Sequence, residues 1–178
     1  MAFMRNVCLT AAVLLCASSA SAQTATSGIG ITIGYPASIG VLVNTSDAIA
    51  VRPELSFTTT SISPTSDVKS TSHSFTIGAD ALFYLHTYDR VRTYVAPHLD
   101  YSHASSSGPS SSDVSITNHG IGVAGSFGAQ YTPTDRFGIF GEVGLGFTHS
   151  SLSSNTFGSG GTVNGWGTRA GVGVIFYP

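Results

Sequence analysis

The chain has 178 residues, of which only 9% are charged, and its formal net charge is −2. Charged residues make up about 25% of ordinary soluble domains, and nucleic-acid-binding domains usually carry a basic patch. The composition therefore argues against nucleic-acid binding, and it suggests that much of the folded surface does not face water.

The first residues have the three parts of a secretory signal peptide. Arg5 supplies a positive charge, VCLTAAVLLCA is an apolar stretch too short to span a bilayer, and the small residues Ala20 and Ala22 precede the expected cleavage site. We therefore predict a cleaved signal over residues 1–22 and one mature domain over residues 23–178. Both cysteines would leave with the signal, so no disulfide is expected in the mature chain.

The remaining chain repeats one pattern three times. Asp47, Asp89 and Asp135 each lie in a short polar turn that a long alternating segment follows, and serine-rich stretches separate these units. Pro, Gly, Ser and Asp in such places are typical of turns and loops, so tight turns should alternate with longer loops. A strand bent at Pro36 would leave an odd number of strands, but we count eight. They are expected near residues 28–35, 38–43, 48–58, 72–85, 91–102, 118–131, 137–148 and 165–177.

Each predicted strand has one apolar face and one face that combines glycine with polar residues. In the last strand, for example, Val172 and Val174 alternate with Gly171 and Gly173. A water-facing surface favours long side chains, whereas a crowded interior needs small ones, so the face with glycine and charge should lie inside. Polar residues inside and apolar residues outside are typical of a transmembrane barrel. We predict an all-β fold, an eight-stranded antiparallel up-and-down transmembrane β-barrel.

Eight ionisable residues fall on the predicted interior face. Glu54, His98 and Glu142 occupy corresponding positions in the three repeats and should lie at similar depth. Such residues could form a salt-bridge network that plugs the lumen and fixes the strand register, or they could line an ion path. We favour the plug because an eight-stranded lumen is normally filled by side chains. The predicted network comprises Arg52, Glu54, Asp80, Arg92, His98, Asp100, Glu142 and Arg169.

On these residues the chain resembles the small eight-stranded outer-membrane barrels, which include OmpA-like membrane domains and opacity-type proteins. The resemblance covers the whole mature chain, including the aspartate-containing turns and the serine-rich loops. Members carry a C-terminal assembly signal of a polar residue, glycine, an apolar or aromatic residue and a final aromatic residue. The matching positions here are Arg169, Gly171, Val174 and Phe176. Tyr177 and Pro178 depart from the pattern because they follow the expected last aromatic residue.

The resemblance implies a location in the outer membrane of a Gram-negative-type bacterium. It implies outer-membrane lipid as the surroundings, with the barrel assembly machinery and periplasmic chaperones as partners during biogenesis. No cofactor is expected. Such barrels have structural, adhesive, porin-like and enzymatic roles, and fold alone does not select one. We predict a non-enzymatic envelope protein, porin-like in architecture, whose surface ligand, if it has one, the sequence does not identify.

Three alternatives stay open. One is a narrow porin, and another is a soluble lipocalin-like carrier in which the two faces are inverted. The third is a lipid-modifying enzyme, for which His149 beside Ser150 and Ser151 is the candidate base. No acidic residue lies close to His149 in sequence, so this signal is weak and no catalytic residue is predicted.

Histidines and glycines also invite ligand-binding interpretations. The chain has six histidines, but no pair has the spacing of a zinc motif, and only His98 and His103 flank the same loop base. Gly120, Gly122 and Gly125 fit the letters of a dinucleotide fingerprint, but alternation continues after them where a helix would be required. We predict neither a metal site nor a nucleotide site.

Overall fold

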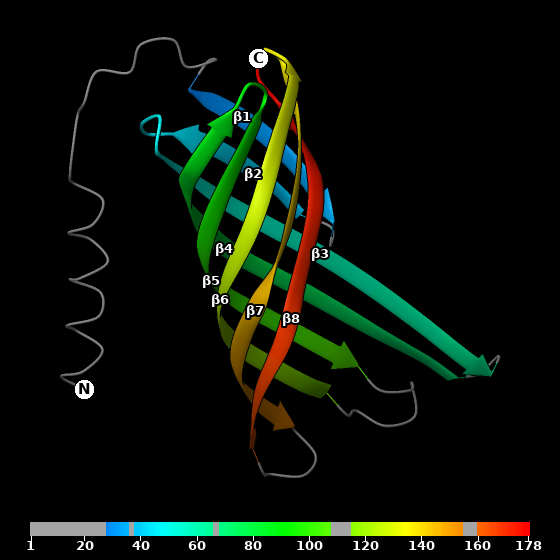
Figure 1. The fold of residues 1–178 in the computed structure, drawn as a ribbon. Coiled ribbons are helices and arrows are strands. Elements are labelled where there is room, and N and C mark those ends of the chain that lie inside the picture. Colours follow the sequence, from blue (N-terminus) through cyan, green and yellow to red (C-terminus); the bar gives the residue numbers. More distant parts are fainter. Residues whose placement is uncertain (1–27, 36–37, 66–67, 108–114, 155–159) are drawn as a thin grey trace.

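The described part of the chain consists almost entirely of β-strands (Figure 1). A computed structural model describes residues 28–35, 38–65, 68–107, 115–154 and 160–178, and the predicted signal peptide lies outside these ranges. The strands are β1 (Ile29–Tyr35), β2 (Ser38–Asn44), β3 (Ile49–Thr65), β4 (Val68–Tyr88), β5 (Val91–Ser107), β6 (Ser115–Thr134), β7 (Phe137–Ser154) and β8 (Gly161–Phe176).

Every strand pairs antiparallel with its neighbours in the chain, and the ring closes between the first strand and the last. The closing ladder runs from Ile31 opposite Phe176 to Tyr35 opposite Val172. The residues before and after Pro36, which itself lies outside the described ranges, form two separate strands, because Ile33 on β1 pairs with Ile39 on β2. The predicted fold, an eight-stranded up-and-down barrel, is therefore confirmed.

Among the residues that the structure describes, no helix has the length and apolar character that crossing a membrane requires.

The strands extend further into the serine-rich stretches than the sequence predicted. The β3–β4 ladder continues through Thr59 opposite His73 and Ser61 opposite Thr71, and the β5–β6 ladder reaches Ser107. Hydroxyl groups support these extensions, since Ser70 donates a hydrogen bond to the Ser107 carbonyl over 3.0 Å. Serine-rich composition favours loops, but paired backbone and cross-strand hydroxyl contacts hold these residues in strands.

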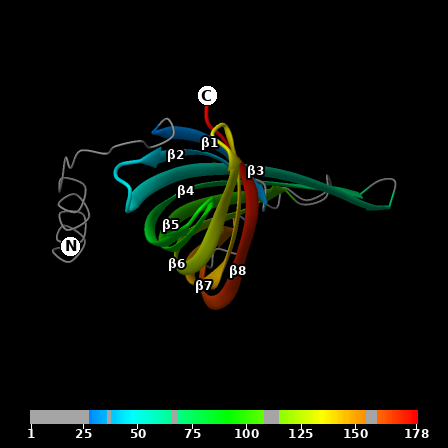
Figure 2. The same ribbon diagram turned by 45° about the horizontal axis from the view of Figure 1, so that its top comes forward.

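The barrel wall is much lower at the first hairpin than elsewhere. Strands β1 and β2 have 7 residues each, whereas β4 has 21. As a result, β3 pairs with β2 only up to Leu55, and its continuation projects with β4 away from the ring (Figures 1 and 2). The interior is consequently most open above the β1–β2 hairpin, on the side that faces away from the tight turns.

The two faces of the sheet are arranged as the alternation predicted, with apolar residues outside. Leu145, Val143 and Phe57 on the outer face are 61–63% exposed, whereas Arg52 and Asp80 on the inner face are 2% and 1% exposed. The inverted arrangement of a lipocalin is not the one that this chain adopts.

The interior is less uniformly polar than the sequence predicted. Toward the tight turns the lumen is filled by a core of mixed character, since the buried apolar and aromatic side chains include Leu42, Leu82, Tyr94, Phe140 and Ile175. These side chains fill part of the lumen below the charged residues. The alternation placed Ile175 and Leu42 on the inner face, but both are large and apolar, whereas the sequence predicted glycine and polar residues there.

One glycine on β6 makes room for the largest fully buried side chain. A Cβ atom on Gly128 would lie 2.6 Å from a ring carbon of Tyr94, and Tyr94 is fully buried. Real Cβ contacts are longer than this, so the Tyr94 ring can pack against β6 only because residue 128 has no side chain.

The tight turns that carry the repeated aspartates use local hydrogen bonds and one unusual backbone angle. The Ser46 hydroxyl accepts a hydrogen bond from the Ile49 amide over 3.1 Å. Asp89 has a φ of 51°, in the left-handed region that aspartate tolerates better than most residues. These features confine the chain reversals to a few residues, and the ladders beside the Asp89 and Asp135 turns each contain one register shift.

We expect Gly128→Ala to lower the free energy of unfolding by about 1–3 kcal/mol, because the added methyl group overpacks the Tyr94 ring. Gly125→Ala is the matched control, since Gly125 is exposed on the same strand and has open space where a Cβ would lie. Urea unfolding in lipid vesicles, followed by the fluorescence of the single tryptophan, measures both variants. Equal stability of the two variants would contradict the packing role of Gly128.

Candidate functional site

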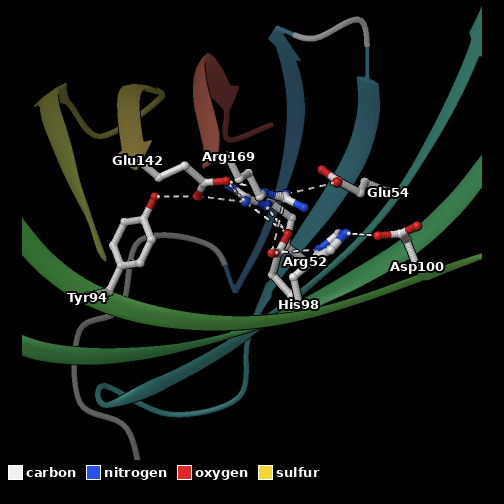
Figure 3. Close-up of polar contacts among 8 residues, drawn as sticks. Arg52, Glu54, Tyr94, His98, Asp100, Glu142 and Arg169 are labelled. Atoms are coloured by element: carbon white, nitrogen blue, oxygen red, sulfur yellow. Dashed lines mark hydrogen bonds and ion pairs between the residues drawn. The ribbon is translucent and has the colours of Figure 1, made fainter. Parts of the chain in front are cut away.

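Seven of the eight predicted interior residues meet in one network across the lumen (Figure 3). Strand β3 contributes Arg52 and Glu54, while β4, β5, β7 and β8 contribute the remaining five. Figure 3 shows Glu142 and Asp100 toward opposite ends of this network, with Arg52 and His98 between them. We call these seven residues the ionic network. Its members are Arg52, Glu54, Asp80, His98, Asp100, Glu142 and Arg169.

Arg52 is the centre of the ionic network. Its Nη2 atom lies 2.9 Å from Asp80 Oδ2 and 2.9 Å from Glu142 Oε2, and its Nε atom donates a second hydrogen bond to Asp80. The guanidinium group also lies 4.7 Å from the centre of the Phe140 ring. Tyr94 donates a hydrogen bond to Glu142 over 3.1 Å. One cation thus joins β3 to β4 beside it and to β7 across the barrel.

His98 and Arg169 extend the network from either side. His98 Nδ1 lies 2.9 Å from Asp80 Oδ1, and its Nε2 lies 3.3 Å from Asp100 Oδ1. Arg169 Nη2 lies 3.3 Å from Glu54 and 3.4 Å from Glu142. The register explains the first contact, because Asp80 and His98 are directly opposite each other on β4 and β5. Glu54, His98 and Glu142, which the repeats place in corresponding positions, are linked here through shared partners.

Arg92 takes no part in these contacts. Its guanidinium group lies 3.4 Å from the centre of the Tyr84 ring, and it also donates a hydrogen bond to the Asp47 carbonyl. Arg92 therefore belongs to a second polar layer near the tight turns. There Tyr84 donates a hydrogen bond to Gln130 over 3.1 Å, and Gln130 in turn donates one to the Tyr177 hydroxyl over 2.8 Å. Of the eight residues that the sequence grouped together, this one lies apart.

Three inward-pointing tyrosines were not selected from the sequence as members of an interior network. Side chains alternate between the two faces of a strand, and Tyr84 and Tyr94 fall on the inner face together with the neighbouring charged residues. Tyr177 follows Gly173 and Ile175 on the inner face of β8. Tyr177 is 5% exposed, and burial raises the pKa of its hydroxyl. The departure from the family's terminal pattern is thus an inward tyrosine that closes the turn side of the lumen.

The geometry of the ionic network favours a structural role over metal binding. Donor atoms of Glu54, Asp80 and His98 lie within 4.8 Å of one another, a spacing that a metal ion could use. However, Arg52 already contacts Asp80, and Arg169 contacts both Asp80 and Glu54. A cation at this point would have to displace a guanidinium group. The arrangement can hold strands in register, block the lumen or, if its contacts part, admit ions.

Cavities lie on both sides of the ionic network. A cavity of about 240 Å³ adjoins it above the short first hairpin, where Tyr35 and Ser38 form part of the lining. A larger cavity of about 410 Å³ opens between the tight turns, and the repeated residues Asp47, Asp89 and Asp135 all line it. The network and the layer of Tyr84, Gln130 and Tyr177 separate these two spaces.

The structure brings together histidines that the sequence showed as scattered. His98 is inside, but four other histidines point outward, one on each of the consecutive strands β4 to β7. Each of them lies two positions toward the loop side from the last large apolar residue on the outer face of its strand. We call this row the histidine belt. It consists of His73, His103, His119 and His149. His149 contacts Asn164 Oδ1 over 2.6 Å, which is an amide rather than the serine and carboxylate pair that a hydrolase would need.

Gly120, Gly122 and Gly125 all lie within β6, and this strand ends in a tight turn rather than in a helix. The strand-to-helix turn of a dinucleotide site is therefore not formed there.

Comparison with one solved structure supports the fold. A major outer membrane protein from Thermus thermophilus superimposes with a TM-score of 0.54 at 10% sequence identity, covering 83% of this chain and 97% of that one. The Acinetobacter baumannii proteins CarO2 and CarO give TM-scores of 0.44 and 0.45 at 14% and 12% identity, each covering 85% of this chain and 98% of its own. At these identities the likeness concerns the fold alone.

No protein-family model matches the chain, and no curated protein matches it in sequence.

Arg52→Ala should lower the free energy of unfolding by about 3–5 kcal/mol, because it leaves the buried carboxylates of Asp80 and Glu142 without their main cation. Arg136→Ala is the control, since Arg136 is exposed at a tight turn and its backbone contact to Tyr177 is retained. Thermal unfolding in detergent, read from the heat-modifiable mobility of the barrel on a gel, measures both. If both variants unfolded at the same temperature as the wild type, the ionic network would not stabilise the barrel.

Proposed function

We propose that this chain is an integral outer-membrane β-barrel protein without enzymatic activity. In this proposal the barrel serves a structural or surface-interaction role, and side chains plug its lumen. The observation that carries the proposal is the inversion of the usual faces: large apolar residues cover the outside, whereas Arg52, Asp80 and Glu142 are 1–8% exposed inside. In water such a surface would be costly, whereas hydrocarbon makes it favourable.

The edges of the apolar surface support a membrane location. On the loop side the outer face ends in aromatic residues on several strands, including Phe75, Tyr101 and Trp166. On the turn side Tyr88 and Tyr131 lie in comparable positions, 63% and 46% exposed. Aromatic girdles at both interfaces are typical of transmembrane barrels.

The plug rests on the contacts across the lumen. Arg52 and Arg169 each bridge carboxylates from different strands, and Tyr94 is packed below them without exposed surface. Ions could pass only if several of these contacts broke together. Because the carboxylates of the ionic network outnumber its two arginines, an opened lumen would favour cations.

A narrow porin is the second candidate, and the low wall at the first hairpin is the observation that favours it. There Arg169 and Asp100 have side chains that are 24% and 23% exposed, and a cavity reaches the network from outside. In this candidate the network acts as a gate rather than as a fixed plug. Recordings in planar bilayers separate the two candidates.

We expect cell fractionation to place the protein in the outer membrane, and a single cysteine at Leu145 to report a hydrocarbon environment when spin-labelled. A label at Thr76, on the inner face of β4, is the matched control and should report a polar environment, since Thr76 lines the cavity above the first hairpin. Recovery of the unlabelled protein in the aqueous phase without detergent would contradict the proposal. So would a label at Leu145 that is freely exposed to water.

In planar bilayers the wild-type barrel should show no sustained conductance, whereas Glu142→Ala combined with Arg169→Ala should open a cation-preferring path. The reason is that these two substitutions remove the side chains that β7 and β8 contribute to the ionic network, while the contact between Arg52 and Asp80 is retained. A wild-type conductance as large as that of the variant would contradict the plug and favour the narrow porin. Arg136→Ala again controls for the removal of a charge.

A further inference from the structure

Two members of the histidine belt lie directly against each other. His103 on β5 and His119 on β6 are register partners. Their ring centres are 4.6 Å apart, and their Nδ1 atoms are 3.2 Å apart. The Tyr101 hydroxyl lies 2.8 Å from the same nitrogen of His119. Two imidazole nitrogens and one hydroxyl oxygen therefore gather at one point on the outer wall.

The pair is accessible from outside the barrel. His119 is exposed and His103 is half-buried, and both point away from the lumen. They follow Tyr101 and Ile121, the last large apolar residues of the outer face on these two strands. This position lies at the loop-side edge of the apolar surface, where water and small ions reach the wall of a transmembrane barrel.

We propose that His103 and His119 form a binding site for a divalent transition-metal ion such as Cu²⁺, Ni²⁺ or Zn²⁺. Imidazole nitrogens bind these ions at about 2.0–2.1 Å, so two nitrogens on one ion lie about 2.9 Å apart at a right angle and about 3.3 Å apart in a tetrahedron. The observed separation of 3.2 Å falls between these values. The two nitrogens thus need little movement to share one ion.

The surrounding sheet holds this arrangement in place. The β5–β6 ladder continues without a register shift from Val91 opposite Tyr131 to Ser107 opposite Ser115, so it extends on both sides of the pair. A metal bound here would link two adjacent strands through their side chains near the loop side. It would also keep open coordination positions for water or for an outside ligand.

A hydrogen bond between the two imidazoles is the competing explanation for the short separation. In that case one nitrogen donates and the other accepts, and no ion is needed. The two explanations differ in what added metal does, because a site made for a metal saturates at one ion per barrel and stabilises the folded state that binds it.

The test uses the full mature barrel, folded in detergent and carrying no histidine tag. We expect Cu²⁺ to give an electron paramagnetic resonance spectrum with two nitrogen ligands at one equivalent per barrel. Ni²⁺ should raise the unfolding temperature by a few degrees. His103→Gln and His119→Gln should each abolish both effects, and heat-modifiable mobility verifies that the variants are folded.

His149→Gln and His73→Gln are the matched controls. His149 contacts Asn164 and His73 contacts Thr59, so neither has a histidine partner in these contacts. Both controls should bind metal as the wild type does. The proposal fails if no saturable binding occurs, or if His103→Gln and His119→Gln bind as tightly as the controls. The measurement is made in detergent, so its outcome is independent of the location and the plug proposed above.

Discussion

A charge inside a narrow barrel has little water around it, and this constraint organises the interior of the protein. Arg52 satisfies it by contacting Asp80 and Glu142 together while its guanidinium group lies over the Phe140 ring. The other polar residues compensate the charges that remain. Arg169 contacts Glu54 and Glu142, and His98 lies between two aspartates. Removing one partner of a buried ion pair destabilises a fold by more than the intact pair stabilises it, so every position in the network depends on the others.

Alternation alone predicted much of this arrangement. It placed all eight charged residues on one face and predicted the barrel, because the side-chain period of a strand is fixed by its geometry. It did not predict the partners, since these depend on how the strands are staggered around the ring. Arg92 illustrates the limit. It shares a face with His98, yet six residues along a strand correspond to about 20 Å, so the two belong to different layers.

Composition predicted the extent of the strands less well than the alternation of side chains predicted their faces. Serine-rich stretches suggested loops, but the ladders extend through Thr59 and Ser105 because backbone pairing does not depend on apolar side chains. Ile175 and Tyr177 follow the inward parity of β8, although neither is small or charged. His103 and His119 are 16 residues apart in the chain, a spacing that matches no metal motif. The antiparallel register of β5 and β6 brings them together, and a search for motif spacing does not reveal this register.

The distances along the chain between the paired charges have a consequence for how the protein is made. Arg52 and Glu142 are separated by 90 residues, and Arg169 and Glu54 by 115. No hairpin contains both members of either pair, so these two contacts form only when strands that are distant in the chain come together. Arg52 with Asp80, and Arg169 with Glu142, can instead pair within single hairpins. Closing the ring therefore completes the pairing of the charges, because it gives Glu54 its contact with Arg169. The same electrostatics would penalise a product whose strands had slipped by one residue.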